Sequence, residues 1–276
     1  MKASEINTKD TKWVFIKKGT CSRTLFYILN REFGHPLENE EQAADPLCGG
    51  IMQQGYQCGL ICGATLAVGA ESTRRRDDPA QAIGLAIEAT QHVMDSFQKR
   101  AGSPDCLDIT EADFSKKTGL AKFLVTGKFL SCFKLTDRWA PEAIAAAKEG
   151  LARESQVFNQ QPLSCASEVV KAMGANRDEQ VTVAGFAGGM GLSGGGCGAL
   201  SAAIWMNSLK WCRENPGKSA YPNPRATETL EAYLAATDYE FECHKICGQH
   251  FKSIDAHTEY IKSGGCAKLI EVLSKS

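Results

Sequence analysis

Apolar residues recur with a spacing near 3.6 positions along three Ala-, Leu- and Glu-rich stretches of the chain, 80–100, 141–158 and 227–239. This spacing predicts amphipathic helices, and Pro141 lies where a first-turn proline belongs. Runs that alternate between apolar and polar residues, which would indicate strands, are scarce. The pattern therefore predicts an all-α protein.

The chain also contains an internal repeat. When it is shifted by 139 positions, the segment CGGIMQQGYQCGLICGATLAVG (48–69) aligns without a gap with AGGMGLSGGGCGALSAAIWMNS (187–208). Cys58 falls on Cys197, and the flanking glycines and apolar positions agree as well. Chance matches in a Cys-rich chain would not extend to these flanks, so we predict a tandem duplication of a Cys-rich helical-bundle unit.

The boundary between the two copies is expected within residues 150–164. The first unit then comprises residues 1–150 and the second residues 151–276, and the two can pack into one body. Segments rich in Gly, Ser and Pro at 102–104 and 216–224 are interpreted as corresponding breaks in the two copies.

A glycine-rich loop in the second copy has the G-x-G-x-x-G spacing of a dinucleotide-binding site, at Gly189, Gly191 and Gly194. The apolar segment VTVAGFA before it has strand character, as such a site requires. In the first copy, however, Met52 stands at the position of Gly191, and the preceding segment ENEEQAADP is too polar for a buried strand. We therefore predict a close-packed loop leading into a helix rather than a phosphate site.

Twelve cysteines are the main chemical feature of the chain. Four match in each copy: Cys21, Cys58, Cys106 and Cys132 in the first, and Cys165, Cys197, Cys243 and Cys266 in the second. Four have no counterpart, namely Cys48, Cys62, Cys212 and Cys247, of which Cys48 and Cys212 are interpreted as packing residues. A protein of a reducing compartment has no need of structural disulfides, so this cysteine content predicts metal, cluster or redox chemistry.

The arrangement of the matched cysteines resembles the C-GCAxxG-C-C family of redox-active proteins, known mainly from bacteria and archaea with anaerobic metabolism. The second copy carries GGGCGALSA around Cys197, and the first carries YQCGLICG around Cys58. Gly198 separates Cys197 from the alanine of the motif, and Ala202 stands where its last glycine would fall, although Gly63 supplies that glycine in the first copy. The resemblance covers nearly the whole chain, once in each copy.

A related domain in the split-Soret cytochromes is linked to haem and to an iron–sulfur centre, so the resemblance implies electron transfer without fixing the cofactor. Covalent haem attachment requires C-x-x-C-H, which is absent here, and His244, His250 and His257 have no counterparts in the first copy. Haem is therefore not expected. No G-x-S-x-G or H-E-x-x-H hydrolase motif is present either.

Three types of chemistry suit four cysteines per copy. An iron–sulfur cluster, 2Fe–2S or 4Fe–4S, takes four thiolates delivered by tertiary structure, and loop N–H groups of Gly194, Gly195, Gly196 and Gly198 could donate to it. Structural zinc prefers closely spaced pairs, and the C-x3-C pairs offer Cys62 and Cys247 as alternative ligands. In metal-free thiol–disulfide exchange, Cys58 and Cys197 would attack as thiolates favoured by a helix N-terminus.

Charge and hydropathy restrict the partners. The 31 Lys and Arg nearly balance the 32 Asp and Glu, which argues against nucleic acid as a ligand. The N-terminal residues contain no secretory apolar run and no segment is suited to membrane insertion, so a cytoplasmic location is expected.

We predict an electron-transfer protein with an iron–sulfur cluster in each copy and a redox partner protein. The alternatives are a metal-free thiol–disulfide oxidoreductase or a zinc-stabilised binding module, and a homodimer is compatible with the sequence.

Overall fold

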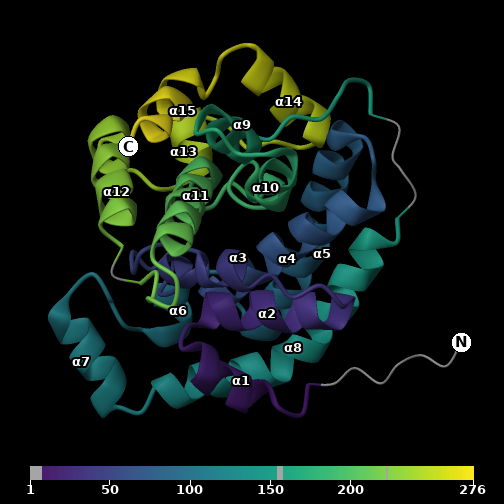
Figure 1. Ribbon diagram of the computed structural model, residues 1–276. Helices are drawn as coiled ribbons and strands as arrows, with labels where there is room; N and C mark the ends of the chain where they lie inside the picture. Colours follow the sequence, from purple (N-terminus) through teal and green to yellow (C-terminus); the bar gives the residue numbers. More distant parts are fainter. Residues whose placement is uncertain (1–7, 154–157, 222) are drawn as a thin grey trace, which may run out of the picture.

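The computed structural model describes residues 8–153, 158–221 and 223–276, and the regular elements within these ranges are helices (Figure 1). The first half contains α1 (Thr11–Lys18), α2 (Cys21–Phe33), α3 (Glu38–Gln42), η1 (Asp45–Leu47, a 3₁₀ helix), α4 (Gly59–Arg75), α5 (Pro79–Ala101), α6 (Cys106–Thr110), α7 (Lys117–Val125) and α8 (Phe129–Leu151). The second half contains α9 (Cys165–Ala172), α10 (Arg177–Thr182), η2 (Ala184–Phe186, a 3₁₀ helix), α11 (Gly198–Glu214), α12 (Pro224–Thr237), α13 (Cys243–Cys247), α14 (Ile254–Lys262) and α15 (Ala267–Ser274). The all-α prediction is confirmed.

Two of the three predicted helices correspond closely to observed ones, 80–100 to α5 and 227–239 to α12. The third prediction, 141–158, is displaced: the helix is α8, which begins twelve residues earlier at Phe129, and positions 154–157 lie outside the described residues. Pro141 is therefore inside a helix and not in a first turn. The cysteine-containing segment before it, FLSCFKLTDRW, continues the same helix and was not recognised from its pattern.

The segment VTVAGFA is not a strand. Its first two residues end α10, and Ala184–Phe186 form the single turn η2. These residues are buried because they pack between the halves and against α5, so their apolar character reflects burial and not a sheet. The prediction of a close-packed loop that leads into a helix is confirmed, since α11 starts at Gly198.

The duplication is visible in the backbone hydrogen bonds. The N–H of Cys58 donates to the Pro104 carbonyl at 2.8 Å, and the N–H of Cys197 donates to the Phe241 carbonyl at 2.8 Å. The loops 102–105 and 238–242 are therefore equivalent. The break at 216–224 corresponds instead to the short turn after α4, so the predicted pairing of 102–104 with 216–224 is wrong.

The halves share one hydrophobic core and form one body. In Figure 1, the second-half helices α9–α15 occupy the upper part of the view and α1, α2, α7 and α8 the lower part, with α4 between them. Helix α4 approaches α10 so closely that a Cβ on Gly69 would overlap the Thr182 carbonyl oxygen. The indole N–H of Trp205 in α11 donates to the Glu40 carbonyl at 3.0 Å.

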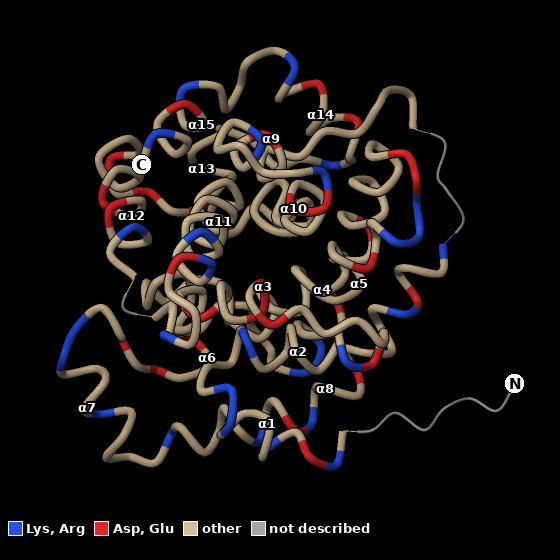
Figure 2. The backbone as a smooth tube through the Cα atoms, viewed as in Figure 1, with Lys and Arg blue, Asp and Glu red and all other residues tan. Residues whose placement is uncertain are grey.

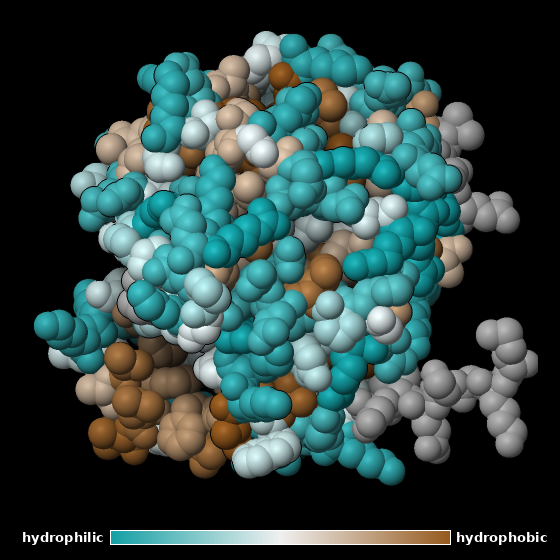
Figure 3. Space-filling view, in the orientation of Figure 1, coloured by the Kyte–Doolittle hydropathy of each residue, from teal (hydrophilic) through white to brown (hydrophobic). Residues whose placement is uncertain are grey.

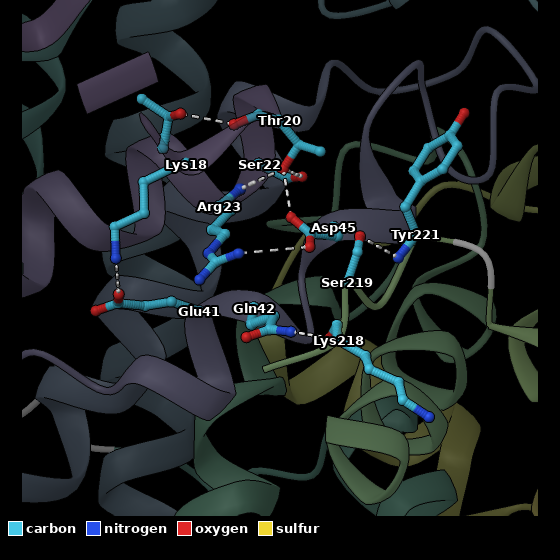
Figure 4. A network of polar contacts seen from close by, with 11 residues as sticks. Lys18, Thr20, Ser22, Arg23, Glu41, Gln42, Asp45, Lys218, Ser219 and Tyr221 are labelled. Carbon is cyan, nitrogen blue, oxygen red and sulfur yellow. Dashed lines mark hydrogen bonds and ion pairs between the residues drawn. The ribbon is translucent and has the colours of Figure 1, made fainter. Parts of the chain in front are cut away.

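A polar network fastens the loop after α11 to the first half (Figure 4). The buried carboxylate of Asp45 accepts a hydrogen bond at 2.7 Å from the Thr20 hydroxyl, which also caps α2, and it faces Arg23 at 3.8 Å. Beside it, the Gln42 amide donates to the Lys218 carbonyl. Tyr221, in the same loop, lies next to the cysteines of the first half.

Basic and acidic residues alternate over the chain without forming one large region of a single sign (Figure 2). None of the helices in the described ranges has the length and apolar character needed to cross a membrane.

Candidate functional site

Three of the four matched cysteines in each half lie at the start of a helix. Cys21 and Cys165 are the first residues of α2 and α9, Cys58 and Cys197 are the N-caps of α4 and α11, and Cys106 and Cys243 are the first residues of α6 and α13. The positive end of a helix dipole favours a thiolate or another anion. Both halves thus direct several helix N-termini at one cysteine site.

In the first half, the cysteines line a cavity of about 380 Å³. The cavity is lined by five cysteines and by five aromatic residues, namely Cys21, Cys48, Cys58, Cys106 and Cys132, and Phe15, Phe114, Phe123, Phe129 and Phe133. The structure therefore brings together all four matched cysteines of this half. It adds Cys48, which has no matched cysteine in the second copy and was predicted to be a packing residue.

Helix α7 forms part of the outer wall of this cavity. Leu120 and Phe123 line the interior, whereas Leu124 and Val125 are 55% and 88% exposed. In the space-filling view, apolar side chains gather over α7 at the lower left (Figure 3). Apolar side chains of α7 therefore contribute both to the cavity lining and to the neighbouring surface.

The glycine loop of each half is a left-handed turn. Five consecutive residues, 49–53, have φ between +54° and +81°, and the aligned residues 188–192 have φ between +57° and +79°. Ile51 is buried and β-branched, for which this conformation costs about 1–2 kcal/mol. The same strained path is kept in both copies, and strain of this kind tends to be retained where a site requires it.

The turn directs one backbone N–H at a cysteine in each half. The N–H of Gly49 donates to the sulfur of Cys21, and the N–H of Gly188 donates to the sulfur of Cys165. Sequence reasoning missed these two donors, although the paired glycines at 49–50 and 188–189 were the signal that could have identified them.

The four glycines predicted to bind a cofactor have other partners. Gly194 donates its N–H to the Gly188 carbonyl at 2.9 Å, and Gly195 donates to the Ser193 hydroxyl at 3.3 Å. Gly196 donates to the Gln57 side chain of the first half at 2.9 Å. Gly198 lies against the Phe186 carbonyl, where a Cβ would not fit. These residues support the loop and its contact with the other half.

In the second half, the structure brings Cys247 into the cysteine site. The sulfur atoms of Cys243 and Cys247 are 3.8 Å apart, and the sulfur of Cys266 also donates to that of Cys247. Phe251 and Tyr260 pack in the same apolar cluster as Cys243 and Cys247. Cys165 and Cys197 are buried close by, and each perturbs the pKa of its cysteine neighbours.

Two cysteines differ from the rest in their pKa. The pKa of Cys21 is lowered because Cys58 donates a hydrogen bond to its sulfur, which raises the pKa of Cys58. Hydrogen bonds from Cys243 and Cys266 lower the pKa of Cys247 to about 3. Burial raises the pKa of Cys197 instead. The thiolate is thus favoured on Cys21 and Cys247, and not on the expected Cys58 and Cys197.

The remaining cysteines are mostly held neutral by burial. Burial raises the pKa of Cys165 and of Cys132 to about 12, and it raises that of Cys212 to about 11. Cys212 is 2% exposed within the core, as a packing residue should be. In the described part of the chain, no group of three or more His, Cys, Asp or Glu side chains is gathered closely enough to hold a metal ion.

The histidines of the last repeat have packing roles. The rings of His244 and His250 stack with their centroids 4.4 Å apart, and His244 contacts the Gly194 carbonyl at 2.9 Å. His257 is 1% exposed and contacts the Leu163 carbonyl at 3.3 Å, and burial lowers its pKa to about 4.

The fold and the site define an all-helical, duplicated protein with one cysteine site in each half. The chain belongs to the C_GCAxxG_C_C family, described as "putative redox-active protein", whose sequence model matches residues 20–144 and again residues 163–275. Membership supports a redox role and confirms the tandem duplication. Neither the curated proteins nor the solved structures contain a significant match to the chain.

Proposed function

We propose that the protein transfers electrons by means of an iron–sulfur cluster held in the cavity of the first half by Cys21, Cys58, Cys106 and Cys132. The observation that carries this proposal is the convergence of these four cysteines, from four different helices, on one cavity. Soft thiolate ligands in a four-cysteine set are those that iron–sulfur clusters take in proteins.

The size of the site argues for a cluster over a single ion. A zinc ion needs four donors at about 2.3 Å from one point. The four thiols of the first half line a cavity of about 380 Å³, which is larger than one ion requires. A cluster with bridging sulfides occupies more space than a single ion, so the size of the cavity supports iron and sulfide over zinc.

The chain supplies groups that stabilise anionic sulfur in the cavity. The N-terminal ends of α2 and α4 face Cys21 and Cys58, and the N–H of Gly49 donates to Cys21. Aromatic side chains line the cavity beside the sulfur atoms. A bound cluster would supply one-electron transfer, and hydrogen bonds to sulfur, local charge and exclusion of solvent are the means by which a protein sets its potential.

Anaerobic purification followed by measurement of iron, acid-labile sulfide and visible absorption tests the proposal. We expect a coloured protein, and we expect Cys58→Ser to lose the colour because Cys58 lines the cavity. Cys62→Ser is the matched control, since Cys62 lies one turn later on α4 and donates to the Gln57 carbonyl instead. That variant should keep its iron and sulfide.

Several results would contradict the proposal. One such result is a colourless protein that contains zinc. Another is a protein that contains no metal after reconstitution with iron and sulfide. If Cys58→Ser kept the full iron content, the cluster would not be bound at this cavity. The sequence also predicted a cluster in the second half, and this stays a prediction: it requires a doubled iron content, half of which is lost in Cys197→Ser.

A further inference from the structure

Cys243 and Cys247 form a pair of thiols in sulfur contact, outside the cavity of the first half. Their sulfur atoms are 3.8 Å apart on the single turn α13. Cys247 has no aligned cysteine in the first half and is not part of the repeated four-cysteine pattern. The redox role of the family therefore does not by itself define a function for Cys243 and Cys247.

The backbone permits a disulfide between these two cysteines. Residues four apart in an α-helix have Cα atoms separated by about 6.2 Å, since the helix rises about 1.5 Å per residue. This lies within the range of about 4.4–6.8 Å that disulfides require. The Cβ atoms of helical residues four apart are about 5–6 Å apart, whereas a disulfide needs about 3.5–4.5 Å. The single turn α13 therefore has to open locally as the bond closes.

The first half contains a C-x3-C pair that lacks this arrangement. Cys62 is fully buried and its sulfur donates to the Gln57 carbonyl at 3.7 Å. Its neighbour one turn earlier, Cys58, donates to Cys21 instead. The same spacing thus places two thiols in contact in the second half, where Cys266 and Tyr260 also lie near Cys247.

The pair differs in access to solvent. Cys243 is 6% exposed, whereas Cys247 is half-buried and is followed by the exposed residues 248–250. An external sulfur atom can therefore reach Cys247 before it reaches Cys243. This order assigns Cys247 as the attacking thiol and Cys243 as the thiol that resolves the intermediate.

We propose that Cys243 and Cys247 are a dithiol site that reduces low-molecular-weight disulfides. The Cys247 thiolate attacks one sulfur of the substrate, its disulfide bond breaks, and one thiolate leaves. Cys243 then loses its proton to solvent and attacks Cys247 within the mixed disulfide, which releases the second thiolate. Both thiolates take up protons, so one substrate disulfide becomes two thiols and the protein gains one disulfide.

This activity requires no residue of the cavity in the first half, so it is independent of the cluster proposed there. A cluster in the second half would use Cys243 as a ligand, so that prediction and the dithiol site exclude each other. Oxidised glutathione is a suitable probe. Trypsin cleaves after Lys245, which separates Cys243 in peptide 226–245 from Cys247 in peptide 246–252. Mass spectrometry of the alkylated digest therefore detects the disulfide as a linked pair of peptides.

We expect one equivalent of oxidised glutathione to release two glutathione thiols per chain and to link peptides 226–245 and 246–252. Cys243→Ser should release one thiol and keep glutathione on peptide 246–252, because the resolving thiol is missing. Cys247→Ser should release none from this site. Peptide 32–74, with Cys48, Cys58 and Cys62, is the internal control and should stay fully alkylated.

Three results would overturn the proposal. The first is wild-type protein in which Cys247 remains alkylated after treatment. The second is a link between peptides 246–252 and 263–268, which would make Cys266 the resolving thiol. The third is glutathione release that persists in Cys247→Ser. Failure of the cluster proposal would appear separately, as absence of iron and sulfide in protein that still forms the linked peptides.

Discussion

The two halves follow nearly the same backbone path and yet surround their cysteines differently. In the first half, the thiols border a cavity that aromatic side chains also line. In the second half, Phe251 and Tyr260 pack directly with Cys243 and Cys247. Duplication thus fixes the helix starts and the left-handed turn, whereas the side chains that face the sulfur atoms decide whether space remains for a ligand.

The difference originates mainly in two equivalent helices, α7 and α14. Leu120 and Phe123 of α7 line the cavity that the cysteines of the first half also line. In α14, Tyr260 reaches Cys247 and His257 reaches the Leu163 carbonyl. Helix α7 therefore borders a cavity beside its cysteines, whereas α14 contacts its cysteine site directly.

The largest stability difference is expected where α2 packs against α4. A Cβ on Gly63 would overlap the Ser22 carbonyl oxygen, whereas the second half has Ala202 at the aligned position. Gly63→Ala should lower the free energy of unfolding by about 3 kcal/mol through overpacking. Ala202→Gly should cost only about 1 kcal/mol, since it affects helix propensity. Urea denaturation measures both, and equal losses would show that the two helix pairs pack alike.

A second contrast concerns the polar groups at the first turn of α2 and α9. The capping hydroxyl of Thr20 donates to Asp45, whereas that of Ser164 donates to the Ala184 carbonyl at 3.0 Å. Burial raises the pKa of Asp45 to about 6, so the folded state binds a proton more tightly than the unfolded state does. The contribution of Asp45 to the free energy of unfolding is fully present below the pKa of Asp45 in the unfolded state, near 4. It is lost as the pH rises through about 6, the pKa in the folded state.

Asp45→Asn tests this contrast, because Asn retains an acceptor for Thr20 but does not titrate. Relative to the variant, the wild-type protein should gain up to about 3 kcal/mol of unfolding free energy as the pH falls from 7 to 3.5. The comparison cancels the effects of other carboxyl groups. Chemical denaturation at a series of pH values measures the difference, and a constant difference would mean that Asp45 titrates normally.

The smallest expected effect concerns the left-handed turn. Gln53 and Leu192 occupy aligned positions, each with φ of +65°. Gln53→Gly should stabilise the protein by about 1 kcal/mol, because glycine adopts this conformation without strain. Leu192 is 7% exposed, so Leu192→Gly should destabilise it through lost apolar burial. Thermal unfolding distinguishes the two, and a stabilised Leu192→Gly would show that strain outweighs packing in both halves.

Much of the architecture could be read from local pattern. Helical periodicity located α5 and α12, and the gap-free alignment around Cys58 and Cys197 revealed the duplication and the cysteine positions. The start of α8 is not evident from the pattern, because Pro141 has the features of a first-turn proline although a long helix can continue through a proline at the loss of one hydrogen bond. VTVAGFA was ambiguous because a short apolar run has the same pattern whether it is a strand or a buried turn.

The sequence alone determined the helical class, the repeat and the eight matched cysteines, because these depend on residue types at fixed spacings. Only the tertiary structure decided that Cys48 joins the first site, that Cys247 touches Cys243, and that the N–H groups of Gly49 and Gly188 face sulfur. Such contacts depend on how helices far apart in the chain pack and where strained turns direct their backbone. Side chains from those helices fix the volume left beside each group of thiols, and no local pattern encodes that volume.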